Sequence, residues 1–359
     1  MSEVQHARLL LAILQERWDD AERLTRAARV DPERLIALCR QTDISPWIHS
    51  RLSDTGRLDL VGPEAARGLT EIRAKVRHDN LLLIAQAERA LDLLRDAGVA
   101  PVLLKGLDLI HRVYRRFDER TLDDVDLLVA RDQLRPALAA LESGGWRVPP
   151  EPKRSHYIRS SHHLGLTSPG PLTVEFELHW NLAQELRFRV DVSGILERSR
   201  ETQIGGRRVR RMDDHDLVAH LLLHHFTHYF DRRVKWAVDL HAIASQPGFS
   251  WDLVVERIRS WDACAVSGFA LLHLRKLFPD WIPEAVVEAL PVAAWRRALT
   301  RPLESDHPLD LFRRTRNRCV QLYLAAVMLE RPSLLPRWLV HRTLRDLRPS
   351  ENPLDRPPK

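Results

Sequence analysis

The chain has 359 residues, and its 55 Lys and Arg exceed its 49 Asp and Glu by 6. This excess is mild for the length. It permits an anionic ligand but does not by itself indicate nucleic-acid binding, so we do not expect nucleic acid as a partner. The three cysteines are far apart and odd in number, which excludes a disulfide framework and favours a reducing cytoplasm. No apolar run approaches the roughly 20 residues that cross a bilayer, and no signal peptide is visible, so we expect a cytoplasmic protein without a transmembrane segment.

Residues 1–97 are predicted to form an N-terminal helical region. Its first apolar cluster repeats at helical spacing, with Leu9, Leu10, Ile13 and Leu14. Asp31 followed by Pro32 is typical of a helix start, because Asp caps the helix and Pro fits its first turn. A broad apolar face over residues 81–94 predicts a further helix that ends near Gly98.

Residues 98–212 are predicted to form a small mixed α/β core. Short apolar or alternating runs favour strands at 99–105, 124–130 and 172–180. Helical patterns cover 107–117 and 132–143, and the second is closed by Gly144 and Gly145. We expect a hairpin-like pair of strands within 146–171 and two short extended pieces on either side of Gly205 and Gly206.

Residues 213–347 are predicted to form a C-terminal helical domain, and the proline-rich residues 348–359 a disordered tail. The expected helices cover 217–230, 234–244, 251–260, 263–277, 283–290 and 309–330. The fold class is therefore α+β, with a small mixed-sheet core between two helical regions.

Two carboxylates stand two residues apart on a predicted strand, at Asp124 and Asp126. Residues two apart in a strand share a face, so these like charges would lie side by side and repel unless a cation binds between them. Oxygen ligands of this kind suit Mg²⁺ held beside a substrate phosphate, with Mn²⁺ as an alternative.

A third carboxylate is available on the strand 172–180, where Glu175 and Glu177 share one face with His179. If the two acidic strands are neighbours, one of these glutamates joins the two aspartates. Three carboxylates could then hold two divalent ions about 3.5–4 Å apart and orient and deprotonate an attacking hydroxyl.

A lysine and a glycine follow the first strand of the core, at Lys105 and Gly106. A glycine after a strand lets backbone N–H groups approach a phosphate, and lysine supplies positive charge. Arg116 and Arg120 could neutralise charge on a leaving pyrophosphate.

These motifs together resemble the DNA polymerase beta-like nucleotidyltransferase superfamily, and within it a bacterial family of uncharacterised nucleotidyltransferases. The resemblance covers residues 80–260. It is carried by Leu104-Lys105-Gly106, Tyr114, Arg120, the run from Asp124 to Val129, the run from Val174 to Trp180, His220 to His228, and Lys235 to Leu240.

The resemblance implies a nucleotidyltransferase-like core and a set of site residues. The metal-binding aspartates correspond to Asp124 and Asp126, the third metal-binding and catalytic carboxylate to Glu177, and the glycine turn to Gly106. Two Mg²⁺ ions and a nucleoside triphosphate are implied as cofactor and substrate, with Lys105, Gly106, Arg120 and His179 as substrate-binding residues. Leu107 departs from the superfamily, which usually has Ser or Gly there.

The resemblance implies that a nucleoside monophosphate is moved to a hydroxyl or similar acceptor and that pyrophosphate is released. The acceptor and the base are open: a small molecule, a peptide natural product or a protein side chain all fit. A non-catalytic module that binds a nucleotide or a partner on the same fold is the main alternative, and Leu107 favours it.

Histidines leave further alternatives open. His179 either contacts substrate or is a half-buried histidine bonded to the backbone, and His156, His162 and His163 are interpreted as surface residues. The helix from residue 213 carries His215-Asp216 and His220, His224 and His228 at helical spacing. We interpret this cluster as structural, with substrate contact as one alternative and a metal phosphohydrolase of the HD type as another.

The last fifty or so residues are rich in arginine. This basic bias could dock on a membrane surface or an acidic partner. We interpret it instead as a solvated helix face.

Overall fold

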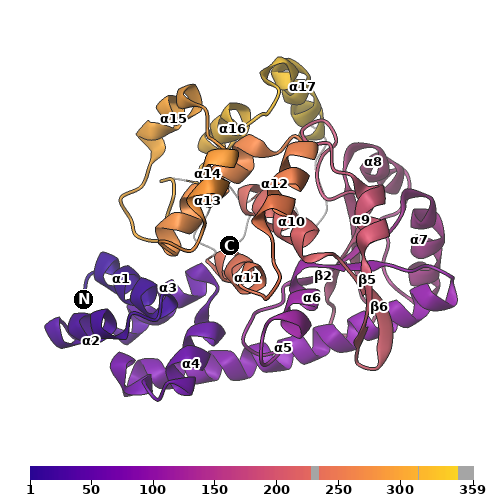
Figure 1. Cartoon of the computed structure of the whole chain (residues 1–359). Coiled ribbons are helices and arrows are strands. Elements are labelled where there is room, and N and C mark those ends of the chain that lie inside the picture. The colour runs from indigo at the N-terminus through magenta and orange to yellow at the C-terminus, as the bar shows by residue number, and fades with distance from the viewer. Residues whose placement is uncertain (228–233, 314, 347–359) are drawn as a thin grey trace.

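The structure is a computed structural model that describes residues 1–227, 234–313 and 315–346. Its N-terminal region is helical, as the sequence predicts, and ends in one long helix, α5, that runs along the base of the molecule (Figure 1). Asp31 caps α3 by accepting a hydrogen bond from the Arg34 backbone at 3.1 Å. The elements are α1 (Glu3–Leu14), α2 (Trp18–Ala27), α3 (Pro32–Thr42), α4 (Ser45–Asp54), η1 (Leu58–Val61) and α5 (Pro63–Asp96).

A six-stranded mixed sheet forms the centre, in the order β3-β4-β2-β1-β6-β5. Its strands are β1 (Val102–Leu104), β2 (Asp124–Leu128), β3 (His163–Thr167), β4 (Glu175–His179), β5 (Arg200–Ile204) and β6 (Arg207–Arg211). The pairs β2–β4 and β1–β6 are parallel, and the other pairs are antiparallel. The parallel β2–β4 pair places Asp124 opposite Glu175 and Asp126 opposite Glu177.

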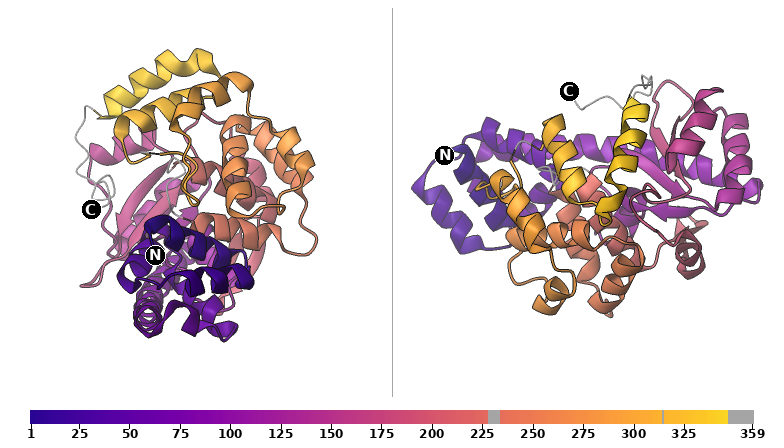
Figure 2. Two further views of the ribbon diagram at one scale, coloured as in Figure 1. Left: turned by 90° about the vertical axis from the view of Figure 1, so that its left-hand side faces the viewer. Right: turned by 90° about the horizontal axis from the view of Figure 1, so that it is seen from above.

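The two faces of the sheet have different neighbours. Val125 and Phe176 lie in an apolar core that also contains residues of α5 and of α7 (Leu134–Ser143). The opposite face belongs to a second, larger core that joins Leu104 and Leu128 to the N-terminal and C-terminal helices. Seen from above, α5 runs along one side of the sheet and the C-terminal helices lie on the other (Figure 2). The acidic residues of β2 and β4 alternate with apolar residues of the first core, so they lie on the second face.

Short helices connect the strands of the core: α6 (Lys105–Arg112), η2 (Arg131–Gln133), α7, α8 (Lys153–Ser160) and α9 (Val192–Arg198). The strand pair expected within 146–171 is confirmed only as a single antiparallel bridge between Arg147 and Thr167, because Lys153–Ser160 is helical and only His163–Thr167 is a strand. Lys153–Ser160 has no alternation of apolar and polar residues, and Pro152 precedes its first turn, which favours a helix start. The strand β3 pairs instead with β4.

The C-terminal region is helical, with α10 (Asp214–Thr227), α11 (Lys235–Ala244), α12 (Trp251–Ser260), α13 (Cys264–Leu277), α14 (Glu284–Ala289), α15 (Ala294–Thr300), η3 (Arg301–Leu303), α16 (Arg318–Val327), η4 (Pro332–Leu334) and α17 (Leu335–Asp346). The helix expected over 309–330 begins later, at Arg318, because the Asn317 side chain accepts hydrogen bonds from the Cys319 and Val320 backbones. The proline-rich tail, and the predicted helix 217–230 beyond residue 227, lie outside the described residues.

The described part of the chain contains no helix long and apolar enough to cross a membrane. The predicted fold class is confirmed, as an α+β chain with one mixed sheet between helical regions. The division at residues 97, 212 and 347 stays a prediction, and one apolar core draws residues from all three predicted regions.

Candidate active site

Asp126 is the centre of a buried charged cluster on the second face of the sheet. Its carboxylate, with the residue 2% exposed, lies 2.8 Å from Lys105 Nζ and 2.9 Å from His179 Nε2. Glu177 Oε2 lies 3.1 Å from the same nitrogen of His179. Both partners of His179 are carboxylates, so its Nε2–H donates to them. The structure thus brings together four of the residues that the sequence predicts.

Lys105, the first residue of α6, reaches Asp126 from just after the adjacent strand β1. Leu104, the residue before it, is paired with Asp126 across the sheet. Lys105 itself has a left-handed backbone with φ of 46°, which costs a side-chain-bearing residue about 1 kcal/mol or more. Burial lowers the pKa of the Lys105 amine, but Asp126, Asp124 and Glu177 outweigh burial and raise it overall. The amine is therefore a permanent cation at neutral pH.

Asp124 adds a second aspartate to the same face of β2. Burial raises its pKa to about 7, and the neighbouring charge of Asp126 adds to the rise. Glu177 behaves in the opposite way, because His163, His179 and Lys105 outweigh burial and hold its pKa well below the usual range. Three carboxylates crowded so closely favour the binding of further positive charge.

Glu175, the alternative third carboxylate, begins β4 opposite Asp124. Burial raises the pKa of Glu175, with Glu177 adding repulsion. Glu175 is absent from the described groups of side chains that could hold a metal ion, whereas Glu177 belongs to one together with Asp126 and His179.

Three imidazoles border the cluster. Burial lowers the pKa of His179, but its hydrogen bonds to Asp126 and Glu177 outweigh burial and raise it to about 9. His163 lies with Nε2 3.6 Å from Glu177 Oε1, and its ring is 4.6 Å from that of His162. The ligand atoms of His162, His163 and His179 all lie within 4.8 Å of one another. The two histidines interpreted as surface residues are therefore partly buried beside the cluster, whereas His156 lies on α8 outside this group.

Arg120 is turned away from the carboxylates. Its guanidinium binds both oxygens of Asp239 on α11, at 2.8 and 2.9 Å, and both residues are buried. Tyr114 donates to the same carboxylate at 2.7 Å. Arg120 also lies under the turn at Gly106, where a Cβ would meet Arg120 Nη1 at 2.9 Å. These contacts give Arg120 a role in supporting the turn, and its contact with a phosphate stays a prediction.

Arg116 points to the N-terminal helices. It binds Asp54 on α4 at 3.0 Å and Glu119 at 2.9 Å. The structure therefore does not bring Arg116 to the cluster.

His220 on α10 is a residue that sequence reasoning did not assign to the site. It is 3% exposed, and neither ring nitrogen has a hydrogen-bond partner among the described residues. Burial lowers its pKa well below the usual value, and the positive charges of Lys105 and His179 add to this effect. Neutral His220 thus adds an unused donor and an unused acceptor next to the cluster. The sequence shows the helical spacing between His220 and His224, but it does not show that His220 interacts with Lys105 and His179.

The residues of the HD-type alternative have other partners. Asp216 is buried between Arg198 and Arg257, at 2.8 and 3.1 Å, and Asp239 binds Arg120. His215 lies 2.7 Å from Asp213, and the His224 ring packs 4.9 Å from that of Trp236. Among the described residues these side chains form no group of metal ligands. His228 lies outside the described residues.

A family model places the chain in a class. Residues 28–279 match the family described as "Uncharacterised nucleotidyltransferase", which is more than half of the chain. The chain belongs to this family, and its class of activity is therefore nucleotidyl transfer. No curated protein matches the chain.

Among solved structures, the chain is similar to the antibiotic-resistance factor ANT(2'')-Ia, known from a solution structure. The match has 15% sequence identity and a TM-score of 0.37, and it covers 50% of this chain and 91% of that one. This likeness is too distant to carry a functional argument.

Proposed function

We propose that the protein is a Mg²⁺-dependent nucleotidyltransferase that moves a nucleoside monophosphate from a nucleoside triphosphate to an acceptor hydroxyl. The observation that carries the proposal is the register of β2 and β4, which sets Asp126 beside Glu177 with Asp124 on the same face. The membership of the family supports the reaction class.

The residues of the cluster fit a divalent ion. Asp126 and Glu177 offer carboxylate oxygens within 4.8 Å of one another. Burial and the charge of Asp126 raise the pKa of Asp124, so a cation bound there would relieve both the burial of its charge and the repulsion. Asp124, Asp126 and Glu177 would hold two Mg²⁺ ions, with Mn²⁺ as an alternative. Ions bound there would stabilise charge on the entering and leaving oxygens.

The chain's own residues have separate tasks in this proposal. Lys105 neutralises the triphosphate next to the turn at Gly106, where the first backbone N–H groups of α6 are free of helical hydrogen bonds. Glu177 is ionised at neutral pH, because its pKa is held low, and it accepts the hydrogen bond of the acceptor hydroxyl. His163 and His179 fix the orientation of Glu177.

The transfer step balances as a displacement at phosphorus. The acceptor oxygen forms a bond to the α-phosphorus while the bond from that phosphorus to the bridging oxygen breaks. Pyrophosphate leaves with this oxygen, and Glu177 takes the hydroxyl proton. The acceptor oxygen and the leaving oxygen would lie in line with the α-phosphorus, beside Asp126 and Lys105. This positioning, together with stabilisation of the developing charge, would accelerate the transfer.

The test uses α-labelled nucleoside triphosphates, cell extract as the acceptor source, and mass spectrometry of the product. The double variant Asp124→Asn with Asp126→Asn should lose label transfer and pyrophosphate release by at least about 10³-fold, because the cation ligands are gone. Asp132→Asn, an exposed carboxylate just after β2, is the control and should keep wild-type transfer.

Two outcomes would contradict the proposal. Undiminished transfer in the double variant would show that the reaction does not need the carboxylates of Asp124 and Asp126. Mg²⁺-dependent binding of a triphosphate by the wild-type protein, without pyrophosphate release from any acceptor pool, would instead support the non-catalytic nucleotide-binding module.

A further inference from the structure

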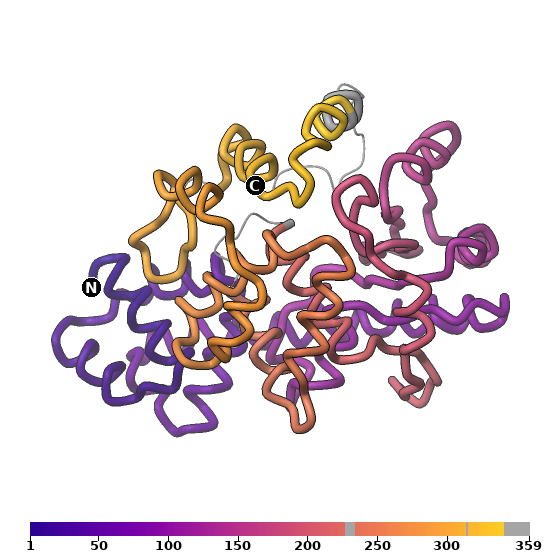
Figure 3. Tube along the Cα trace, turned by 45° about the horizontal axis from the view of Figure 1, so that its top comes forward, coloured from indigo at the N-terminus to yellow at the C-terminus, as the bar shows by residue number. Residues whose placement is uncertain are grey.

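A cavity of about 540 Å³ lies beside the histidines of the cluster, and we call it the arginine pocket. This volume suits a small molecule. Its cationic lining consists of Arg131, Arg159, Arg189, Arg331 and Arg337, and Glu185 is the one acidic residue that lines it. Arg131 lies in η2 just after β2, Arg159 in α8, Arg189 between β4 and α9, Arg331 just before η4, and Arg337 in α17. Figure 3 shows the chain around α17, in yellow, near the magenta segment that contains α8.

The five arginines keep much of their charge available. Arg189 and Arg331 share one carboxylate, Asp262, at 3.3 and 3.6 Å. Arg159 and Arg337 are exposed, and no ion pair is found for either within the described ranges. Arg131 lies over the ring of Trp180 at 4.9 Å, which holds its guanidinium plane in place. Such preset planar forks suit phosphate or carboxylate groups.

The arginine pocket lies on one side of the charged cluster. His162 lines the pocket, and its ring is 6.0 Å from that of His179, which in turn contacts Asp126. The order of the sheet puts β4 and β3 on one side of β2, and β1 with Lys105 on the other. The pocket therefore borders the Glu177 side of the cluster, opposite the lysine that is assigned to the triphosphate.

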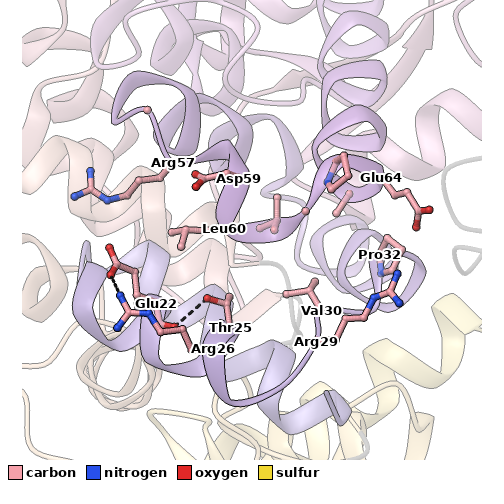
Figure 4. A pocket seen from close by; sticks show the side chains of 15 residues that line it. Glu22, Thr25, Arg26, Arg29, Val30, Pro32, Arg57, Asp59, Leu60 and Glu64 are labelled. Carbon is pink, nitrogen blue, oxygen red and sulfur yellow. Dashed lines mark hydrogen bonds and ion pairs between the residues drawn. The ribbon is translucent and has the colours of Figure 1, made fainter.

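A second cavity shows that this charge is particular to the arginine pocket. The N-terminal pocket, of about 650 Å³, is lined by residues between Glu22 and Ala65 (Figure 4), and no residue of the cluster lines it. Its charges balance, with Arg26, Arg29 and Arg57 against Glu22, Asp59 and Glu64. Arg26 binds Glu22 at 2.6 Å, so this pocket offers an anion little net attraction.

We infer that the arginine pocket binds an anionic group of the acceptor, so that the acceptor is a small molecule carrying a phosphate or carboxylate besides the reacting hydroxyl. This inference rests on the proposed function. An anion held by the arginines would place the rest of the molecule past His162 toward Glu177. The nucleotide would bind from the Lys105 side, so that the two substrates meet at Asp126.

The experiment measures pyrophosphate binding to the full-length protein by calorimetry. Pyrophosphate also resembles the leaving group, so the nucleotide end is first saturated with Mg²⁺ and an α,β-methylene nucleoside triphosphate. The variant combines Arg159→Gln with Arg337→Gln, two exposed residues whose replacement leaves the core untouched. We expect pyrophosphate affinity to fall at least about tenfold, and affinity for the nucleotide analogue to change by less than about twofold.

The matched control is Arg26→Gln with Arg29→Gln in the N-terminal pocket, which removes the same charge and should leave both affinities unchanged. Equal pyrophosphate affinity in the Arg159/Arg337 variant and the wild type would overturn the inference. A parallel loss of nucleotide affinity would overturn it too, by assigning the pocket to the triphosphate.

The proposed function is read separately, from the titration with the nucleotide analogue. If the wild type does not bind this analogue with Mg²⁺, the proposed function and the acceptor assignment fail together. If it does, and pyrophosphate affinity is independent of the two arginines, the acceptor assignment alone fails.

Discussion

The two sides of Asp126 are built in different ways. On the β1 side the buried Lys105 has a left-handed backbone, and the turn rests on the buried pair of Arg120 and Asp239. On the β4 side are three imidazoles, Glu177 and a pocket open to solvent.

This difference indicates two tasks. A fixed charge in a supported turn suits a constant group, the triphosphate, because little has to adapt on binding. Imidazoles can donate or accept hydrogen bonds, and arginines lie beside them. These groups suit the acceptor, which would be recognised through its polar groups. Each prediction below tests one side of Asp126 against the other.

The largest expected effect separates the two glutamates of β4. Glu177→Gln should lower label transfer by about 10²–10⁴-fold, because the amide neither takes the hydroxyl proton nor binds a cation as a carboxylate does. Glu175→Gln, two residues away on the same face, should lower it by less than about threefold, since Glu177 is the glutamate that shares His179 with Asp126. Rates of pyrophosphate release measure both, and the reverse order would make Glu175 the third carboxylate.

The β1 side should depend on the support of its turn. Arg120→Met leaves Asp239 buried without its bidentate partner, so the free energy of unfolding should fall by about 3–5 kcal/mol. Adding Asp239→Leu removes the unpaired charge and should restore part of the loss. Arg154→Met breaks a partly exposed ion pair with Glu142 and should cost about 1 kcal/mol or less.

Denaturant unfolding and nucleotide binding together decide what Arg120 does. If Arg120 supports the turn, folded Arg120→Met protein keeps most of its affinity for the nucleotide analogue. A loss of affinity with unchanged stability would instead make Arg120 the phosphate contact that the sequence predicts.

Local patterns predict the strands that carry the carboxylates but not how these strands align. The alternation around Asp124 and Glu177 was visible in the sequence, and the strands β2 and β4 include both residues. Their adjacency depends on a parallel pairing across an intervening segment that contains α7, α8 and β3. Such a register is set by packing against α5 and α7, which no short window encodes.

Long-range partners explain the remaining differences. Arg120 was expected at a phosphate because it stands four residues before Asp124, yet its partner Asp239 lies 119 residues further along the chain. The arginine pocket joins His162 to Arg331 and Arg337, which the sequence shows only as part of a basic C-terminal stretch. The burial of His162 and His163 likewise follows from β3, which sequence patterns did not resolve.

A smaller effect is expected from the cation of the β1 side. Lys105→Met should weaken binding of the nucleotide analogue by about tenfold, because a charged contact to the triphosphate is lost. The same change should strengthen binding of Mg²⁺ in the absence of nucleotide, because the amine no longer neutralises Asp126. Calorimetry with each ligand measures both effects, with Lys105→Arg as the charge-preserving control. Weaker Mg²⁺ binding in Lys105→Met would contradict this account of the β1 side.

The smallest expected effect concerns His220 on α10, whose pKa is lowered in part by the charges of both Lys105 and His179. His220→Asn should change the free energy of unfolding by about 1 kcal/mol or less, since neither ring nitrogen has a hydrogen-bond partner to lose among the described residues. Turnover should nevertheless fall by about threefold to tenfold, because a substrate atom would use the free donor or acceptor. His224→Asn, one turn along the same helix, is the comparison. Because His224 packs against Trp236, its replacement should lower stability more than turnover per folded molecule. A stability loss without a turnover loss in His220→Asn would make His220 a packing residue, and substrate contact on this face would then come from β1 and β4 alone.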